Sequence, residues 1–548
     1  MRDSPPNMLD YEETYRNFKL EVPEHYNFGF DVVDRWAEDR TKLALVSVEP
    51  DGQNAQYHSF WDLKVESNRF ANVLKDLGVN KGDRVFIMLP RIPQWYIALL
   101  GMFKLGIVPM PATTLLTVKD IEYRINTSEA TLAITDPENA DKLQEAAGNC
   151  PSLKSLAVVG GEKRGWVSYE ESMADAPSHL DGVEPTRNDD PLLIYFTSGT
   201  VGPPKMVLHT QASFGFAMVG TAKYWHDLKS TDLQWTISDT GWAKAAYGKL
   251  FGQWTQGAAI LQHNTVGRFD AKQTLGILER FGVTSFCAPP TVYRMLVLED
   301  LTENDLSYLD HCTSAGEPLN PEVMKQWEDG TGLTIYDAYG QTETVLLIAN
   351  YRCLPVKPGS MGLPMPGIQA SVVDDDGNEV PTGEEGQIAI RVKPDRPVGL
   401  FSGYWRDDEA TARSFLGDWY LTGDKAHRDE DGYFWFVGRA DDLIISAGYR
   451  IGPFEVESAL IEHPAVAESA VVASPDPVRG DIVKAFVVLT PDHVGSDELV
   501  LSLQEHVRKT TAPYKYPRAV EFVTDLPKTI SGKIRRVELR ERELNKAR

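Results

Sequence analysis

The chain has 548 residues, of which 42% are hydrophobic and 24% charged, a balance typical of a globular protein with more than one domain. Its formal net charge of −24 at pH 7 argues against a nucleic-acid partner, because binding one requires a clustered basic surface. The four cysteines are scattered, with no CxxC motif and no histidine at metal-ligand spacing, which indicates reduced thiols and no zinc site.

The N-terminal sequence and the longest apolar region exclude two kinds of segment. MRDSPPNMLDYEETYRNF lacks the apolar core of a signal peptide. The apolar region near residues 95–112 is interrupted by Lys104 and two prolines, so we expect no transmembrane segment. Together with the reduced cysteines, this favours a cytoplasmic protein.

Helix and strand patterns alternate through the first part of the chain. Apolar residues recur at helical spacing over 59–77, and Gly78 follows as a typical helix stop. A second helix is predicted over 95–105. Short apolar runs predict strands at 83–89, 106–111, 130–135 and 155–159. This alternation predicts parallel α/β layers.

The stretch after the next predicted strand is the most informative in the chain. An apolar run over 191–196 predicts a buried strand, and TSGTVGPPK follows at 197–205. Backbone N–H groups, hydroxyls and a lysine in such a loop bind an anion together, as in phosphate loops. The common P-loop pattern is not met, since Pro204 replaces its second glycine and Met206 its Ser or Thr. An ordinary turn after a strand remains open as the alternative.

Three later stretches extend this signal. They are DAYGQTET (337–344), YLTGDKAHRDEDGYFWFVGRADDLI (420–444) and LPKTISGKIRR (526–536). With TSGTVGPPK they resemble, in the expected order, the motifs of the adenylate-forming superfamily, which contains acyl- and aryl-CoA synthetases, peptide-synthetase adenylation domains and luciferases. SDTGWAK (238–244) and the chain length look most like the AMP-forming medium-chain acyl-CoA synthetases. Val201 departs from the family pattern, which has Thr or Ser there.

The patterns and the resemblance imply the same organisation. A large N-terminal domain over 1–438 would contain layered α/β subdomains and a small β-rich subdomain near 365–395, and it would bind ATP and the acyl substrate. A hinge at 439–442 would lead to a smaller, mobile α+β domain over 443–548. In that domain we expect helices at 451–463 and 498–510 and strands at 469–473, 484–489 and 519–523.

The resemblance also implies a set of catalytic and nucleotide-binding residues. Lys533, Thr342 and Glu343 would be catalytic, with Glu343 as the ligand of a Mg²⁺ that bridges the ATP phosphates. A lone Glu in a polar loop is usually solvated, and only the motif context favours this role. ATP and AMP binding is assigned to Thr197, Ser198, Gly199, Thr200, Gly202, Lys205, Gly316, Glu317, Pro318, Asp337, Ala338, Tyr339, Thr342, Asp424, Arg439 and Arg450.

The acyl pocket is expected to be lined by Trp242, Tyr247, Cys287 and Gly340. In acetate-specific relatives a Trp at the position of Gly340 closes this pocket. Its absence here predicts an acid that is medium-chain, branched or aromatic rather than acetate. Lys244, in the same region as Trp242, faces either the mouth of the pocket or the solvent.

The second half-reaction would use a different arrangement of the two domains. By resemblance, Asp441 is the hinge residue, and rotation about it turns SAGYR (446–450) toward the adenylate. Gly448 and Tyr449 would line the coenzyme A channel, and Arg450 would hold a phosphate of AMP or CoA.

The resulting prediction is an AMP-forming acyl-CoA synthetase, an acid–thiol ligase. A carboxylic acid and ATP give acyl-adenylate and pyrophosphate, and CoA then gives acyl-CoA and AMP. Two alternatives remain open: an adenylation enzyme that loads a carrier-protein phosphopantetheine, and a non-catalytic sensor of nucleotide or acyl-adenylate. Intact Lys533, Glu343 and Asp424 argue against the sensor, and a luciferase-like oxygenase is disfavoured.

Overall fold

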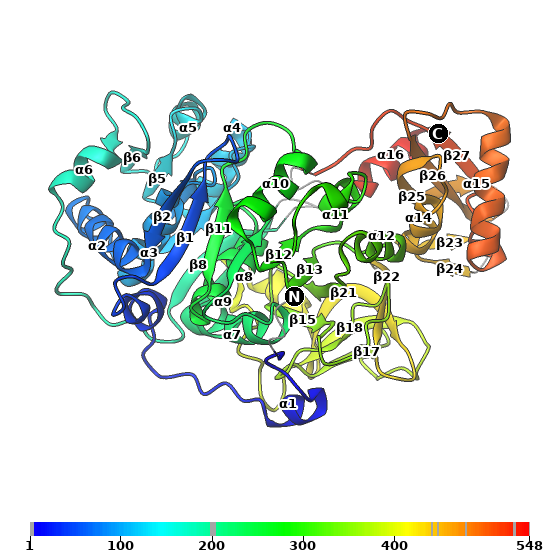
Figure 1. The fold of residues 1–548 in the computed structure, drawn as a ribbon, viewed down its shortest axis with the longest axis horizontal. Helices are drawn as coiled ribbons and strands as arrows, with labels where there is room; N and C mark the ends of the chain where they lie inside the picture. The colour runs from blue at the N-terminus through cyan, green and yellow to red at the C-terminus, as the bar shows by residue number, and fades with distance from the viewer. Residues whose placement is uncertain are drawn as a thin grey trace.

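The computed structural model describes residues 5–197, 204–439, 442–446, 449–476, 479–529 and 533–546. Within these residues, the strands form five sheets, and helices pack against them (Figure 1). The chain after residue 442 builds its own sheet at one end of the molecule, drawn in orange and red. The expected α/β architecture, with a large N-terminal part and a smaller C-terminal part, is confirmed.

A five-stranded parallel sheet is built from residues 84–168. In spatial order its strands are β4 (Val108–Pro111), β3 (Arg84–Met88), β5 (Leu132–Thr135), β6 (Ser155–Val158) and β7 (Val167–Ser168). Its helices are α2 (Phe60–Asp76), α3 (Pro93–Lys104), α4 (Val118–Ser128), α5 (Ala140–Ala147) and α6 (Tyr169–Asp175). A capping box between Ser59 and Asp62 starts α2, and Gly78, at φ +70°, follows its end. The helices and strands predicted here from periodicity are confirmed.

A nine-stranded sheet forms the centre of the molecule. In spatial order it contains β16 (Leu363–Pro364), β15 (Leu346–Ala349), β14 (Ile335–Gly340), β13 (His311–Ala315), β12 (Ser285–Ala288), β10 (Leu233–Thr236), β11 (Ala259–His263), β1 (Leu43–Val48) and β2 (Ala55–Ser59). The central pairs are parallel and both edges antiparallel. Because the carboxyl ends of parallel strands open on one edge, Ala315 and Ala338 lie side by side there.

Helices cover this central sheet. They are η3 (Thr221–Trp225), α8 (Ala243–Lys249), α9 (Phe251–Thr255), α10 (Ala271–Phe281), α11 (Pro290–Leu296) and α12 (Pro321–Thr331). The largest apolar cluster includes Tyr247, Cys287 and Ala338. A second cluster packs α10 and α11 against the sheet through Leu275 and Tyr293, among others.

Two smaller sheets complete the N-terminal part. β8 (Pro191–Phe196) and β9 (Met206–Thr210) pair antiparallel, and β19 (Gly403–Tyr404) joins the other edge of β9. The β-rich subdomain contains β17 (Ala370–Val373), β18 (Gly386–Arg391), β20 (Phe415–Leu416), β21 (Trp419–Arg428) and β22 (Phe434–Arg439). The small β-rich region expected near 365–395 is therefore present, and it extends to residue 439.

The C-terminal part has its own sheet and apolar core. Its strands are β23 (Ile444–Ser446), β24 (Tyr449–Ile451), β25 (Val466–Asp476), β26 (Gly480–Leu489) and β27 (Ala519–Phe522). Its helices are α14 (Pro453–Ile461), α15 (Asp497–Thr510) and α16 (Arg536–Lys546). The predicted helices and strands of this part are confirmed, whereas the β23–β24 hairpin was not predicted.

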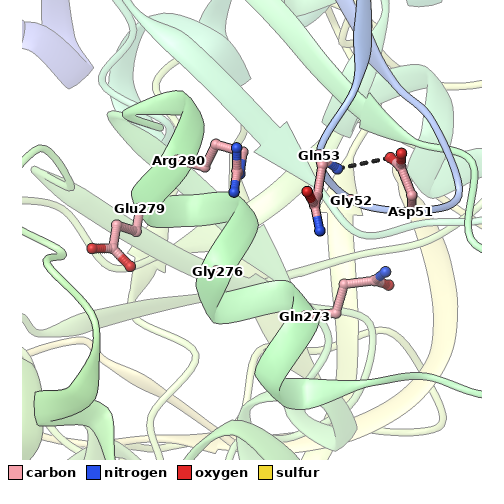
Figure 2. Close-up of a pocket in the computed structure, with 7 residues that line it drawn as sticks. All are labelled: Asp51, Gly52, Gln53, Gln273, Gly276, Glu279 and Arg280. Carbon is pink, nitrogen blue, oxygen red and sulfur yellow. Dashed lines mark hydrogen bonds between the residues drawn. The ribbon is translucent and has the colours of Figure 1, made fainter.

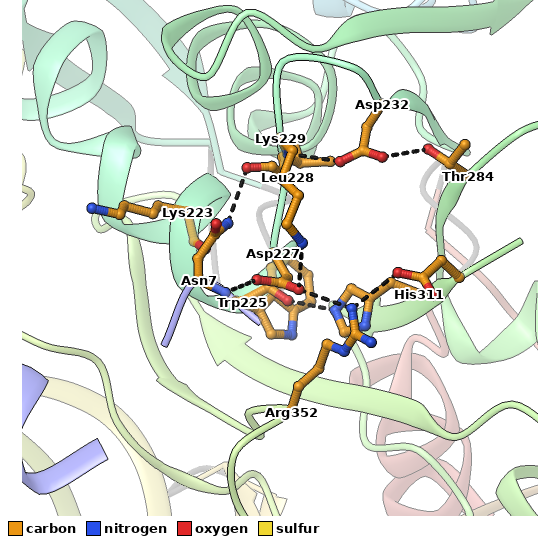
Figure 3. Close-up of polar contacts among 11 residues, drawn as sticks. Asn7, Lys223, Trp225, Asp227, Leu228, Lys229, Asp232, Thr284, His311 and Arg352 are labelled. Carbon is orange, nitrogen blue, oxygen red and sulfur yellow. Dashed lines mark hydrogen bonds and ion pairs between the residues drawn. The ribbon is translucent and has the colours of Figure 1, made fainter. Parts of the chain in front are cut away.

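The N-terminal segment lies against the surface of the central sheet region. The Asn7 N–H donates to Asp227 Oδ1 at 2.6 Å, and Asn7 Nδ2 donates to the carbonyls of Lys223 and Leu228 (Figure 3). Arg352 Nη1 pairs with the same Asp227 carboxylate at 2.9 Å. No helix in the described ranges is long and apolar enough to cross a membrane.

Candidate active site

Asp424 lies at the centre of a hydrogen-bond network that joins two of the sequence motifs. It is buried in β21, and its Oδ2 accepts hydrogen bonds from the Tyr339 hydroxyl at 2.6 Å and from Gln341 Nε2 at 2.7 Å. Arg439, opposite Asp424 on β22, places Nε 4.0 Å from Asp424 Oδ1. Burial raises the pKa of Asp424, and these partners offset part of the rise. The network holds this carboxylate in one orientation.

Glu343, the predicted metal ligand, is held by an aromatic residue from a distant segment. Glu343 Oε1 accepts a hydrogen bond from the Tyr404 hydroxyl at 2.7 Å. Lys205 Nζ lies 4.6 Å from the centroid of the Tyr404 ring, a cation–π contact. Burial raises the pKa of Glu343, while the Tyr404 hydrogen bond and the Lys205 charge act in the opposite direction. The lysine of the phosphate-loop motif and the carboxylate of DAYGQTET therefore meet at Tyr404.

The side chains around Glu343 indicate which kind of metal ion this site could bind. In the described parts of the chain, no group of three or more His, Cys, Asp and Glu side chains could hold a metal ion by itself. Mg²⁺ is usually bound through one or two carboxylates together with substrate phosphates and water. A single carboxylate beside the phosphate-loop lysine fits that mode of binding.

The two ends of the phosphate-loop motif are fixed to each other. The Thr197 N–H donates to the Lys205 carbonyl at 3.0 Å, and the Lys205 N–H donates to Thr197 Oγ1 at 3.0 Å. The strands that flank the motif, β8 and β9, are antiparallel, so it connects a β-hairpin. The other predicted members of this loop lie outside the described residues: Ser198, Gly199, Thr200 and Gly202.

A buried histidine that sequence reasoning missed contacts DAYGQTET from β9. His209 Nε2 lies 2.7 Å from the Thr342 carbonyl oxygen, and His209 Nδ1 lies 3.1 Å from Ser213 Oγ. The ring is stacked on Phe214 and is fully buried, which lowers its pKa to about 3. The available signal was a histidine four residues after Lys205, on a strand that otherwise has an apolar pattern.

The loop after β13 contains three of the predicted ATP- and AMP-binding residues, Gly316, Glu317 and Pro318. Gly316 has φ +110°, a conformation that strongly favours glycine, and a Cβ there would meet no atom within 4 Å. Glu317 lies 3.8 Å from the Arg294 guanidinium, and Pro318 follows in the same loop. Asp337 is buried next to Ala338, and its Oδ1 has no hydrogen-bond partner among the described residues.

Lys244 is only partly exposed to solvent, and its amino group contacts the end of β13. Its place at the mouth of an acyl pocket stays a prediction. Its Nζ donates to the carbonyl of Ala315 at 2.9 Å. Burial lowers its pKa, and Glu317 and Asp337 act in the opposite direction. Lys244 therefore adds a cation to the edge where β13 and β14 end.

Three of the predicted acyl-pocket residues lie around α8. Trp242 precedes the first residue of this helix, and Tyr247 is buried within it. Cys287 is fully buried on the neighbouring β12 and belongs to the same apolar cluster as Tyr247. The assignment of these residues to an acyl pocket stays a prediction.

The space beside Gly340 is narrow. A Cβ on Gly340 would lie 3.0 Å from the Val345 carbonyl oxygen and 3.1 Å from a methyl carbon of Leu346. The β14–β15 ladder shifts register between Tyr339 and Gly340, which brings the following segment close to this position. An added Cβ would therefore be crowded by the chain itself at this point. The extension of the acyl pocket past Gly340 stays a prediction.

Lys533 reaches the same region from the C-terminal part. Its backbone is fixed locally, because its carbonyl accepts from the Thr529 N–H at 2.7 Å and its own N–H donates to Thr529 Oγ1 at 3.0 Å. Its charge lowers the pKa values of both Asp424 and Lys244. The charge of Lys533 therefore acts on β21, which contains Asp424, and on α8, which contains Lys244.

The residues predicted for the second half-reaction are only partly described. Asp441, Gly448 and the side chain of Arg450 lie outside the described residues. The Tyr449 ring stacks on Tyr514 with centroids 4.3 Å apart, and 52% of Tyr449 is exposed.

Two surface cavities lie elsewhere. One, of about 480 Å³, separates the β1–β2 turn from α10, with Gln273 and Arg280 among the residues around it (Figure 2). The other, of about 660 Å³, lies along α12 and is lined by Met324 and Tyr336, among others. Neither is lined by a predicted site residue.

Comparison with known proteins agrees with this geometry. The AMP-binding enzyme family matches residues 33–405, and the AMP-binding enzyme C-terminal domain matches residues 455–533. The chain is 48% identical over 550 residues to the mitochondrial acyl-coenzyme A synthetase ACSM3 of Mus musculus. The alignment covers 98% of this chain and 94% of that protein.

Solved structures show the same fold. The anthranilate CoA ligase AuaEII in complex with anthranoyl-AMP superposes with a TM-score of 0.88 at 32% identity, covering 96% of this chain and 99% of that one. The acyl-CoA synthetase of Brucella canis superposes with a TM-score of 0.76 at 36% identity, covering 99% and 100%.

The comparisons correct one expectation. A cytoplasmic protein was expected, but the similar synthetases ACSM3 and ACSM4 are named mitochondrial. Signals for mitochondrial import are amphipathic and rich in arginine rather than apolar, so the lack of an apolar N-terminal core carried no information about this location.

The adenylate-forming resemblance drawn from four motifs is confirmed, and the chain belongs to the AMP-binding enzyme family.

Proposed function

We propose that this chain joins a medium-chain, branched or aromatic carboxylic acid to coenzyme A through an acyl-adenylate. The expected class, an AMP-forming acyl-CoA synthetase and thus an acid–thiol ligase, is confirmed by the relatives. The structural observation that carries the proposal is the meeting of Lys205, Glu343 and Asp424 with the charge of Lys533, from four segments of the chain.

The proposed roles at the nucleotide follow from the fixed groups. The Asp424 carboxylate, oriented by Tyr339 and Gln341, would accept hydrogen bonds from the ribose hydroxyls. These hydrogen bonds would be charge-assisted. Asp337 Oδ1, buried without a partner among the described residues, would accept a hydrogen bond from the adenine amino group. ATP and CoA as substrates fit the family.

Charge neutralisation is the main task of adenylation, because the carboxylate and the α-phosphate are both anions. Lys533 and Lys205 supply fixed positive charge, and Glu343 would hold Mg²⁺. When bound, Mg²⁺ would offset charge on the phosphates. Removing one preorganised group of this kind typically costs on the order of 10²–10³-fold in rate.

Transfer to the thiol would follow rotation of the C-terminal part about Asp441, with Gly448 and Tyr449 along the path of coenzyme A. A carrier-protein phosphopantetheine would use the same adenylate, so the acceptor has to be distinguished by experiment.

The experiment measures AMP and pyrophosphate release from ATP with acetate, butyrate, 2-methylbutyrate, hexanoate, octanoate and benzoate, with and without CoA. We expect CoA-dependent AMP formation, poor turnover of acetate, and a loss of about 10²-fold or more in adenylation for Lys533→Ala. Lys528→Ala serves as the matched control, because Lys528 pairs with Glu468 at 2.8 Å within the C-terminal part. Pyrophosphate release that CoA does not accelerate would point to a carrier protein. Absence of turnover with every acid would overturn the proposal for this panel.

A further inference from the structure

We propose that His209 is a positioning residue for adenylation: it holds the Thr342–Glu343 segment against β9, the strand that continues from Lys205. This inference deepens the proposed function and rests on the adenylation roles given above to Thr342 and Glu343. His209 contacts the backbone of Thr342, and we infer that it acts through this segment rather than on the substrate.

The hydrogen bonds define one tautomer of His209. The Thr342 carbonyl can only accept, so His209 Nε2 must carry the proton that it donates over 2.7 Å. His209 Nδ1 is then unprotonated and accepts from the Ser213 hydroxyl at 3.1 Å. Ser213 is itself held by Thr210, whose N–H donates to Ser213 Oγ at 2.8 Å. The ring is thus fixed from both sides.

The same strand also fixes Glu343 from the other direction. Leu208 and Val207 of β9 pair with Gly403 and Tyr404 of β19, and Tyr404 donates to the Glu343 carboxylate at 2.7 Å. Through His209, β9 therefore holds the carbonyl that precedes Glu343, and through β19 it holds the Glu343 side chain.

Such coupling has a direct consequence for rate. β9 begins at Met206, directly after Lys205. The positions of the Lys205 amino group and of the Glu343 carboxylate therefore both depend on this strand. In enzymes that work by positioning, a displacement of about 1 Å can cost about 10²-fold in rate. Loss of the Nε2 hydrogen bond should therefore reduce adenylation much more than it reduces transfer from a ready-made adenylate.

The test compares His209→Asn with His209→Gln. A glutamine amide nitrogen can take the place of Nε2 and donate to Thr342, whereas the shorter asparagine loses this bond. Two rates are measured on each sample: adenylation, by pyrophosphate release, and transfer from synthetic acyl-adenylate to CoA. Their ratio does not depend on the fraction of folded protein. Calorimetric titration with ATP, in Mg²⁺ and in EDTA, gives a readout without turnover.

A second buried histidine provides the matched control. His311 is also buried, and its Nε2 lies 2.7 Å from the carbonyl oxygen of Trp225. Its ring contacts Tyr336 at the start of β14 and not the Thr342–Glu343 segment, so it differs from His209 in the backbone that it holds. His311→Asn removes the same kind of bond and should leave the ratio of the two rates within about threefold of the native value.

For His209→Asn we expect the ratio of adenylation to transfer to fall about 10- to 100-fold, mainly in kcat. The gain in ATP affinity on adding Mg²⁺ should shrink, and His209→Gln should restore most of the ratio. An unchanged ratio in His209→Asn, or an equal loss in His311→Asn, would overturn the positioning role. A native chain without CoA-dependent AMP formation would instead refute the proposed function, so the two failures are distinguishable.

Discussion

The Tyr404 hydroxyl donates to Glu343 Oε1 at 2.7 Å while the Tyr404 ring lies 4.6 Å from Lys205 Nζ. One side chain thus contacts the proposed metal ligand with its polar end and the phosphate-loop lysine with its face.

Tyr404→Phe keeps the ring and removes only the hydroxyl. The Glu343 carboxylate would then lose the group that orients it, and we expect the kcat of adenylation to fall about tenfold, the size of one lost charge-assisted hydrogen bond. Tyr433→Phe is the control, since the Tyr433 hydroxyl donates over the same 2.7 Å to the Pro355 carbonyl. Pyrophosphate release checks the prediction, and equal rates in the two variants would contradict it.

Asp424→Asn tests the ribose assignment. The variant keeps the size of the side chain but removes the charge, so kcat/KM for ATP should fall about 10- to 100-fold while the KM for the acid stays within about threefold. Asp429→Asn is the matched control, because the Asp429 carboxylate pairs with Lys357 at 2.7 Å and not with the site. A rise in the KM for the acid alone would rule out the nucleotide role.

Gly340→Ala separates a packing role from a pocket role. An added methyl group would press on the Val345 carbonyl oxygen at 3.0 Å, which cannot move freely because it is backbone. We expect the free energy of unfolding to fall by about 1–3 kcal/mol and all acids to be affected alike. Gly276→Ala, on α10, has no atom within 4 Å of the new methyl and should instead be neutral or stabilising. Unchanged stability with a selective loss of long acids would favour the pocket role.

Lys249 should make stability depend on pH. Its buried Nζ donates to the Ser238 carbonyl at 2.8 Å, and burial, together with Arg91, lowers its pKa to about 7 from the ordinary 10.5. Because the folded-state pKa is below that of the unfolded chain, unfolding takes up protons between these values, and stability rises with pH across that window. Below it, burial of the charged form costs the most.

Lys249→Met removes that cost. We expect the variant to be more stable than the native chain at and below pH 7, the lower end of that window, by on the order of 1–3 kcal/mol, and the advantage to shrink toward pH 10. Urea unfolding at several pH values measures this difference, with the exposed Lys272→Met as control. A difference that does not change with pH would show that the Lys249 charge has no such role.

The elements that could be predicted from the sequence are those with a strong local signal. The helix after Ser59 was predicted from its apolar stripe and its glycine stop, which are local signals. The structure adds a capping box at its start. The β23–β24 hairpin was missed because its strands have three residues each, too few to show a period.

The site followed from the sequence only where motifs carried it. Asp424 and Glu343 were named from motifs, but their partners Gln341 and Tyr404 depend on contacts between segments far apart in the chain. Lys244 could not be placed, because its direction is set by the end of β13. The crowding beside Gly340 could not be predicted for a related reason: it depends on how closely the neighbouring strand approaches.

The fixed ends of the phosphate-loop motif set a limit on how this enzyme can change. Thr197 and Lys205 are bonded to each other in both directions, so the segment between them spans a constant gap. With both ends fixed, an inserted residue would have to bulge out of the loop, and it would change the register of the loop's N–H groups and hydroxyls relative to Lys205. We therefore expect a one-residue insertion between Thr197 and Lys205 to reduce activity more than a substitution such as Val201, which keeps the length of the loop.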